Sequence, residues 1–168
     1  MIIVQVINSL ETGGAERLAL SLHRGYLTRG ERSVLISLAG SEHGWTGTGI
    51  FSLGLSSPYD PRALLRLAGM PQETYFEHAD IIHSHLFPSQ MIASLVRDGI
   101  PLNGRLITTE HSTSNRRRGT IAGRLTDRLF YPLYDIVICV SDGAAAELKS
   151  WIPDVSDRLE VISNGIDL

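Results

Sequence analysis

Two hydrophobic patterns alternate along this chain, namely short continuous apolar runs and longer stretches with a single apolar face. Residues 2–7 are aliphatic except for Gln5, which is typical of a strand covered on both faces of a parallel sheet. After Gly14 the apolar residues recur at helical spacing, at Ala15, Leu18, Ala19, Leu22 and Tyr26. A strand, a glycine turn and a helix of this kind form the first half of a βαβ unit.

The same alternation continues along the chain. Strands are predicted at 33–38, 50–53, 80–85, 105–109, 135–140 and 159–162, and helical segments at 61–68, 73–78, 88–96, 120–130 and 142–151. We therefore expect an α/β fold with a doubly wound, mostly parallel sheet of about seven strands and right-handed crossovers. With a strand order of 3-2-1-4-5-6-7, ligands would bind beyond the carboxyl ends of the first and fourth strands, where the order reverses.

Length and composition narrow the class of protein. The 168 residues, of which 43% are hydrophobic, suffice for one domain with a substantial core. The formal net charge of −3 provides no overall attraction to nucleic acid. Because Cys139 is the single cysteine and lies in an apolar run, an intrachain disulfide is impossible, a zinc site is disfavoured and a cytoplasmic location is favoured. No apolar run reaches the roughly 18 residues that span a membrane.

The glycine turn after the first strand is a candidate anion site. Free N–H groups at the start of a helix attract negative charge, and Gly13 and Gly14 would let a phosphate approach the backbone closely. A plain tight turn could contain the same two residues. The G-x-G-x-x-G fingerprint is absent, and the second predicted strand ends without an acidic residue to hold a ribose, so a nicotinamide cofactor is disfavoured.

Three histidines lie near the ends of predicted strands. His83 and His85 share the same alternation parity and should point to one face, where paired core histidines are commoner than a metal site. His111 follows an apolar strand and precedes a polar loop, which makes it the stronger candidate for chemistry near neutral pH; the alternative is a histidine that only hydrogen-bonds this loop. Glu110 could be a general base or a capping carboxylate. We predict no metal site.

A basic stretch, Arg116, Arg117 and Arg118, follows His111 closely in the sequence. Arginine suits planar contacts with phosphate or carboxylate groups. These three residues would then form a basic rim at the carboxyl edge of the sheet, suited to a ligand that carries phosphate or to the anionic inner face of a membrane. The alternative is a solvated loop.

Five short motifs, taken in order, resemble the N-terminal half of the retaining family 4 glycosyltransferases. They are Gly13-Gly-Ala-Glu-Arg17, Asp80-Ile-Ile-His-Ser-His85, Thr109-Glu-His-Ser112, Tyr134-Asp-Ile-Val-Ile-Cys-Val-Ser-Asp142 and Val161-Ile-Ser-Asn-Gly-Ile-Asp167. The resemblance runs along nearly the whole chain. It implies a GT-B architecture, in which two Rossmann-like domains face each other across a cleft, and residues 1–168 would be the N-terminal, acceptor-side domain.

The resemblance also implies roles for individual residues. Gly13 and Gly14 would approach the diphosphate of a nucleotide-sugar donor, which is a co-substrate, so no cofactor is implied. His111 would orient a hydroxyl near the transferred sugar and would not act as the nucleophile. The residues expected to line the cleft or contact the acceptor are His85, Glu110, Arg116, Arg117 and Arg118.

In the family, most donor-binding residues belong to a C-terminal domain, and Asn164 and Gly165 resemble the segment that leads into it. We therefore expect this chain to be one half of a hexosyltransferase of cell-envelope polysaccharide biosynthesis, and to be inactive alone. Its acceptor would be a glycan, a lipid-linked sugar or a small molecule, with possible peripheral contact with an anionic membrane and no nucleic acid partner. The alternative is a stand-alone nucleotide- or sugar-binding or regulatory domain without catalysis.

Overall fold

The chain folds around a parallel sheet. The computed structural model describes residues 1–11, 13–40, 47–70, 76–99, 104–111 and 116–164. Within these ranges, seven strands pair in the order β3-β2-β1-β4-β5-β6-β7, which confirms the predicted order and the doubly wound, Rossmann-like fold class. The strands are β1 (Ile2–Ile7), β2 (Arg32–Ala39), β3 (Ile50–Leu55), β4 (Ile81–His85), β5 (Arg105–Glu110), β6 (Ile136–Cys139) and β7 (Leu159–Val161).

Helices connect the strands, as the sequence pattern predicts. They are α1 (Gly14–Thr28), α2 (Arg62–Ala68), α3 (Ser89–Gly99), α4 (Ile121–Phe130) and α5 (Asp142–Trp151), with the 3-10 helices η2 (Phe76–His78), η3 (Arg116–Gly119), η4 (Tyr131–Leu133) and η5 (Pro153–Arg158). The expected helical connector at 73–78 is observed only as η2, because residues 71–75 lie outside the described ranges. None of the helices in the described ranges is both long and apolar enough to cross a membrane.

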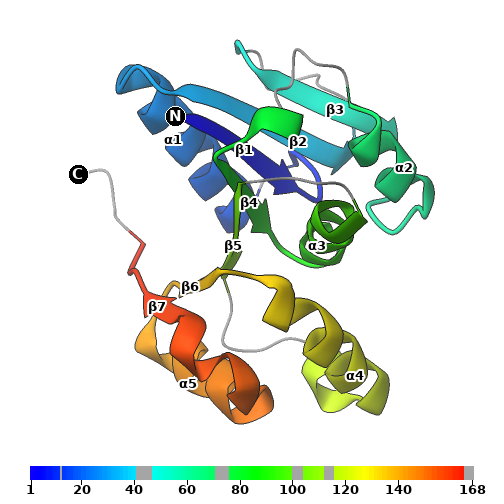
Figure 1. The fold of residues 1–168 in the computed structure, drawn as a ribbon, viewed down its shortest axis with the longest axis vertical. Helices are drawn as coiled ribbons and strands as arrows, with labels where there is room; N and C mark the ends of the chain where they lie inside the picture. The colour runs from blue at the N-terminus through cyan, green and yellow to red at the C-terminus, as the bar shows by residue number, and fades with distance from the viewer. Residues whose placement is uncertain (12, 41–46, 71–75, 100–103, 112–115, 165–168) are drawn as a thin grey trace.

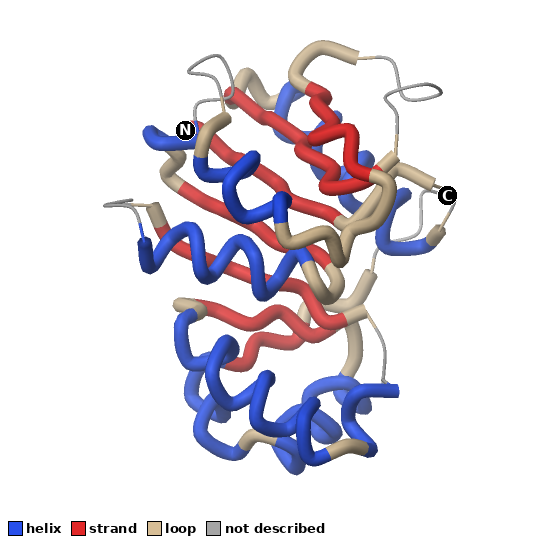
Figure 2. Tube along the Cα trace, turned by 90° about the vertical axis from the view of Figure 1, so that its right-hand side faces the viewer, coloured by secondary structure: helices blue, strands red, loops and turns tan. Residues whose placement is uncertain are grey.

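The helices cover the sheet unequally (Figure 1). Successive side chains of a strand point to opposite faces, so the sheet supports two separate apolar cores. Under α1 lies a small core of Ile7, Leu10, Ala19, Leu20, Leu35 and Ile50. On the opposite face, α2, α3 and α5 close a larger core around Val6, Ile36, Ile82, Leu106 and Val137. Figure 2 shows helices in front of the strands on this second side.

The point where the strand order reverses lies between β1 and β4. Gln5 of β1 is in register with His83 of β4, and Ile7 with His85. His85 is in turn in register with Thr109 of β5. Because all these strands are parallel, their carboxyl ends meet at one edge of the sheet, and the segments that follow β1, β4 and β5 begin there.

Candidate active site

A chain of polar side chains runs from β1 to the segment after β5. Gln5, His83 and His85 are buried, and the rings of His83 and His85 lie 4.1 Å apart, centroid to centroid, which confirms that both point to one face. His85 Nε2 lies 3.1 Å from Gln5 Oε1, and His85 Nδ1 lies 3.3 Å from Nε2 of His111. His111 is half-buried, so it connects this buried chain to the carboxyl edge of the sheet.

These contacts indicate which ring nitrogen of His85 and of His111 carries the proton. A carbonyl oxygen only accepts hydrogen bonds, so with the Gln5 amide in this orientation His85 carries its proton on Nε2. The Nδ1 atom of neutral His85 then has a lone pair, and His111 donates to it from Nε2. Nδ1 of His111 is left as an acceptor. A half-buried imidazole in this tautomer can accept a hydrogen bond from a hydroxyl group.

Burial keeps three histidines of the site, His83, His85 and His111, neutral. It lowers the pKa of His83 to about 3 and the pKa of His85 well below its ordinary value, and nearby His111 acts in the same direction on both. Burial also lowers the pKa of His111, while the charge of Glu110 acts to raise it. Near neutral pH, His111 is therefore a neutral hydrogen-bonding group.

Glu110 is the centre of a buried hydrogen-bond network. Its Oε1 accepts from Gln90 Nε2 at 3.0 Å and from the hydroxyl of Tyr131, and its Oε2 accepts from Arg118 Nη2 at 2.7 Å. All four side chains are buried. Three donors therefore hold both carboxylate oxygens, which supports an anchoring role for Glu110 and not the role of a general base.

Arg117 forms a second buried ion pair. Its Nη1 lies 2.8 Å from Oδ1 of Asp127 in α4, and its guanidinium carbon lies 3.6 Å from the centroid of the Phe87 ring. Oδ2 of Asp127 accepts from Trp151 Nε1 at 3.0 Å. Burial raises the pKa of Asp127, although Arg117 and Trp151 act against this shift. These contacts join η3, α4 and α5 to the turn after β4.

The prediction of an exposed basic rim is wrong for two of the three arginines. The side chain of Arg118 is 4% exposed and that of Arg117 is 18% exposed, and both face acidic partners inside the fold. For Arg117 and Arg118 the alternative of a solvated loop is wrong for the same reason. Positive charge near a buried carboxylate lowers the cost of burying that carboxylate, which explains why these arginines turn inward. A role of Arg116, Arg117 and Arg118 toward an acceptor stays a prediction.

The glycine turn lies at the same edge, after β1. Gly13 is the N-cap of α1 with φ −155° and ψ 171°, and α1 starts at Gly14. A Cβ atom added to Gly14 would meet nothing within 4 Å, whereas one added to Gly13 would collide with the Glu16 carboxylate. Neither glycine has a left-handed backbone, so glycine provides space here and not a positive φ. The anion site stays a prediction.

The turn after β4 is a feature that sequence reasoning missed. Leu86 has φ 65°, a left-handed conformation that a leucine rarely adopts and that is often found at functional sites. Asn8, directly after β1, fixes this turn because its Nδ2 donates to the carbonyl of Phe87 at 2.8 Å and its Oδ1 accepts from the N–H of Ser89 at 3.0 Å. The one sequence signal was a polar residue at the end of an apolar strand.

Gln5 and Gln90 were also missed as members of the site. Gln5 had a signal, since it is the only polar residue within an aliphatic strand, but a single sequence gives no indication that its partner is His85. Asn164 is exposed at the end of the described chain, and Gly165 lies outside the described residues. Among the described residues, no group of three or more His, Cys, Asp or Glu side chains is arranged to hold a metal ion.

Comparison with protein families gives one match. The model described as Glycosyltransferase Family 4 matches residues 12–168. This range includes the glycine turn, both histidine-containing strand ends and the two buried ion pairs described above. No curated protein matches the sequence.

Several solved structures share the fold. The glycosyltransferase from Rickettsia africae ESF-5 is 20% identical, with a TM-score of 0.71 over 99% of this chain and 43% of that chain. Anabaena Alr3699/HepE in complex with UDP is 15% identical, with a TM-score of 0.70 over 99% and 45%. The lipopolysaccharide outer core galactosyltransferase WaaB, in its apo form, is 8% identical, with a TM-score of 0.68 over 99% and 46%. This chain therefore spans less than half the length of these solved chains.

Proposed function

The chain belongs to Glycosyltransferase Family 4, and on this premise we propose that it is the acceptor-side domain of an enzyme that transfers a hexose from a nucleotide-sugar, with retention of the anomeric configuration. The observation that carries the proposal is the arrangement of Gln5, His85 and His111 at the reversal point of the sheet. It provides one neutral, half-buried imidazole in a defined tautomer, next to the edge where doubly wound sheets bind ligands.

In the proposed reaction His111 orients a sugar hydroxyl. Its Nδ1 accepts a hydrogen bond from that hydroxyl, while the contact of Nε2 with His85 fixes the ring. Orientation of this kind accelerates a reaction by holding the reacting groups in a productive geometry. A neutral imidazole suits this role, because an imidazolium would have no lone pair to accept with.

The donor diphosphate would bind at the start of α1. The N–H groups of the first helical turn and the positive end of the helix dipole favour an anion there, and the space beside Gly14 admits one. A uridine nucleotide is the first donor to test, since two of the similar solved structures are described as complexes with UDP and UDP-glucose. We propose that a second domain supplies the other wall of the donor site and that this chain alone is inactive.

The acceptor class follows from the same proposal. A glycan, a lipid-linked sugar or a small molecule would each offer the hydroxyl that His111 orients. We propose that the reaction takes place in the cytoplasm, where nucleotide-sugars would be the donors, and that it contributes to cell-envelope polysaccharide. The galactosyltransferase WaaB is described as acting on the lipopolysaccharide outer core, which supports this direction.

Donor binding is tested by titrating the isotope-labelled chain with UDP-glucose and GDP-mannose, followed by NMR. We expect weak, millimolar binding, with the amide signals of Gly13 and Gly14 shifting first. Micromolar affinity would contradict the need for a second wall. Shifts confined to other parts of the chain would contradict the donor site itself.

Transfer is tested in the protein that carries this chain, by acceptor-dependent release of nucleoside diphosphate and by the anomeric configuration of the product. His111→Ala should lower kcat by about ten- to a hundredfold, because the oriented hydroxyl is lost. An inverted product would contradict retention. A normal rate in the His111→Ala variant would contradict the role of this residue.

A further inference from the structure

Two aromatic rings meet at the carboxyl edge of the sheet. Tyr59 lies in the segment after β3 and Phe87 in the turn after β4, and their ring centroids are 6.2 Å apart with the ring planes tilted by 56°. Tyr59 is 68% exposed, and among the described residues it is the one exposed tyrosine, phenylalanine or tryptophan. Single exposed apolar side chains are common at protein surfaces, so the significance of Tyr59 depends on how its ring is held and where it lies.

Phe87, which supports the ring of Tyr59, is itself held by contacts from other segments. The guanidinium carbon of Arg117 lies 3.6 Å from the centroid of the Phe87 ring, and Nδ2 of Asn8 donates to the carbonyl of Phe87. The preceding residue, Leu86, has the left-handed φ of 65° described above. Such backbone strain persists only where surrounding contacts impose it, and it concentrates at functional sites. The orientation of the Phe87 ring is thus determined by residues after β1 and in η3 as well as by its own turn.

The segment that carries Tyr59 has a restricted backbone. Pro58 and Pro61 lie on either side of Tyr59, and the proline ring fixes φ. Ser57 accepts from two N–H groups, that of Tyr59 to its Oγ and that of Asp60 to its carbonyl, each at 3.2 Å. The ring of Tyr59 is therefore presented to solvent on a backbone that loses little conformational freedom when a ligand binds.

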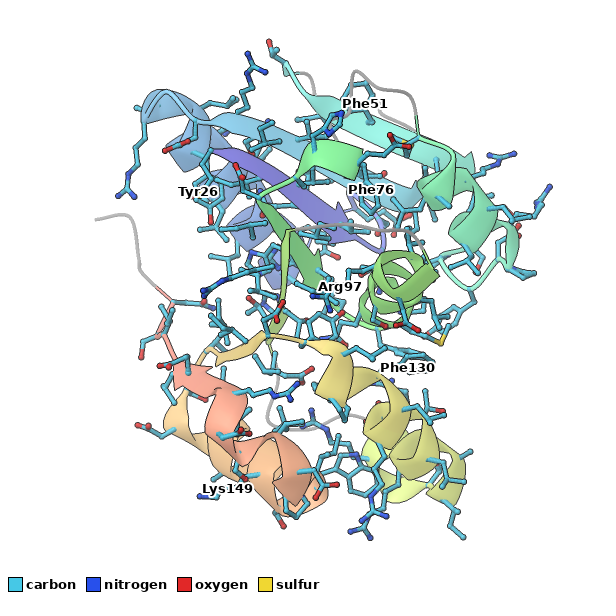
Figure 3. The ribbon with its side chains drawn as sticks, viewed as in Figure 1. Tyr26, Phe51, Phe76, Arg97, Phe130 and Lys149 are labelled. Atoms are coloured by element: carbon cyan, nitrogen blue, oxygen red, sulfur yellow. The ribbon has the colours of Figure 1, made fainter. Side chains whose placement is uncertain are left out.

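The position of the aromatic pair separates it from the donor turn. Helix α1, where the donor diphosphate is proposed to bind, covers one face of the sheet, whereas α2 and α3, which follow the two aromatic segments, cover the other. These two helices pack against each other, and Phe76, labelled in Figure 3, belongs to the core on their side. Phe87 also follows closely after His85, whose ring faces His111. The pair is thus next to the residues proposed to orient the acceptor and on the opposite face from α1.

We propose that Tyr59, supported by Phe87, is a subsite that binds a pyranose ring of the acceptor. The face of a pyranose presents C–H groups, which pack on the negatively polarised face of an aromatic ring, while the sugar hydroxyls stay at the rim. The inference deepens the proposed function, on which it rests, because it selects an acceptor that carries a sugar ring, whether in a glycan or in a lipid-linked sugar.

The polar neighbours of Tyr59 favour a sugar over a protein partner. The carboxylate of Asp60 accepts from the N–H of Arg62 at 2.9 Å and pairs with the Arg62 guanidinium at 2.6 Å. The side chain of Arg62 is 64% exposed, so its guanidinium can also donate to sugar hydroxyls. One ring among hydrogen-bonding groups matches a ligand that has both an apolar face and hydroxyl groups, whereas a specific protein interface buries a larger apolar core.

Saturation-transfer difference NMR on the 168-residue chain tests the subsite. The probes are methyl β-glucoside, octyl β-glucoside below the concentration at which it forms micelles, and glycerol, a polyol without a ring. We expect saturation to pass from aromatic protons of the protein to both glucosides, with millimolar affinity, and not to glycerol. Equal affinity for the two glucosides assigns the subsite to a glycan, and tighter binding of the octyl glucoside assigns it to a lipid-linked sugar; both results support the subsite.

Substitutions of Tyr59 separate the ring from the rest of the side chain. Tyr59→Leu keeps an apolar side chain without an aromatic face and should weaken glucoside binding about three- to tenfold. Tyr59→Phe keeps the ring and should stay within about twofold of the unaltered chain. Leu65→Ala is the matched control, since it removes an apolar side chain of α2 that is 75% exposed, and it should bind like the unaltered chain. All three variants should keep the melting temperature because the changed side chains are exposed.

Three outcomes would overturn the inference. The first is the absence of binding to either glucoside at tens of millimolar sugar, and the second is equal binding by Tyr59→Leu and the unaltered chain. The third is a loss of UDP-glucose affinity in Tyr59→Leu, measured from the amide shifts of Gly13 and Gly14, that is as large as the loss for glucosides. The ring would then belong to the donor site.

The proposed function is judged separately, in the protein that carries this chain. There Tyr59→Leu should raise the acceptor KM about three- to tenfold and leave the donor KM unchanged. Glucoside binding at Tyr59 together with absent sugar transfer would reject the transferase and leave the subsite intact. Sugar transfer with an unchanged acceptor KM in Tyr59→Leu would reject the subsite and leave the transferase intact.

Discussion

Nδ1 of His85 lies 3.3 Å from Nε2 of His111, and the opposite nitrogen of His85 faces the carbonyl oxygen of Gln5. Through His85, the buried amide of Gln5 in β1 is connected to the half-buried ring of His111 after β5. The two contacts connect residues that are 80 and 26 positions apart in sequence. With the amide oxygen of Gln5 facing His85, we expect the proton position on His111 to depend on Gln5, a residue that does not itself reach the edge of the sheet.

Replacing Gln5 tests this dependence. In Gln5→Leu the acceptor for His85 Nε2 is lost, so we expect His111 to populate both neutral tautomers instead of one. Long-range proton–nitrogen NMR spectra of the histidine rings measure this directly. Gln5→Glu is the control, since it keeps an acceptor oxygen and should keep the tautomer. An unchanged His111 spectrum in Gln5→Leu would show that Gln5 does not set the proton position.

Gly14→Ala tests the space beside the glycine turn. The added methyl group meets nothing within 4 Å and the backbone is not left-handed, so the melting temperature should fall little or rise slightly. Nucleotide-sugar binding should nevertheless weaken by about tenfold or more if a phosphate occupies that space.

Gly25→Ala, in the C-terminal part of the same helix and also without neighbours within 4 Å, is the control for the helix itself. It should raise stability by about 0.5–1 kcal/mol and leave nucleotide-sugar binding unchanged. A stable Gly14→Ala chain with undiminished binding would remove the phosphate from this turn.

Glu110→Gln tests the buried anchor. Removing one charge leaves Arg118 without its ion-pair partner in the interior, which should cost about 3–5 kcal/mol of unfolding free energy. Urea denaturation followed by circular dichroism measures it. Glu147→Gln, at an exposed position of α5, should change the free energy by less than about 0.5 kcal/mol.

The double variant Glu110→Gln/Arg118→Met separates the ion pair from the rest of the network. It should be more stable than Glu110→Gln alone, because the unpaired buried charge is gone. If the single and double variants are equally destabilised, the contacts of Glu110 with Gln90 and Tyr131 matter more than its charge pair.

The neutral buried histidines predict how stability depends on pH. Burial lowers the pKa of His83 to about 3 and the pKa of His85 well below its ordinary value, so the unfolded chain binds protons below pH 6.5 that the folded chain excludes. Stability should therefore be complete above pH 6.5 and decrease as the pH falls from 6.5 toward 3. The expected slope is about 1.4 kcal/mol per pH unit for each histidine.

His83→Gln provides the comparison for this slope, since glutamine can keep a polar contact with Thr109, which lies 2.7 Å from His83 Nε2. Denaturant titrations at a series of pH values between 7 and 5 should give a smaller slope for this variant than for the unaltered chain. Equal slopes would mean that protonation of His83 does not govern acid unfolding.

The sequence by itself determined the order and type of the elements. Continuous aliphatic runs predicted buried parallel strands, and apolar residues at helical spacing predicted the helices. The start of α5 is also fixed locally, by the cap Ser141, which accepts from the N–H of Ala144 at 3.2 Å. The reversal point between β1 and β4 followed as well. These features are readable because hydrophobic periodicity and caps act over a few residues and are the same in any fold.

Only the tertiary structure decided which polar groups meet. The consecutive residues Arg117 and Arg118 read as a basic surface, yet each turns to a different buried carboxylate, Asp127 and Glu110. Likewise, the spacing of Ile121, Leu125 and Leu129 indicates a helix with an apolar side, but not that this side faces outward. The charge and the periodicity are local properties, whereas the partner that makes burial favourable comes from another element and depends on the packing of the whole chain.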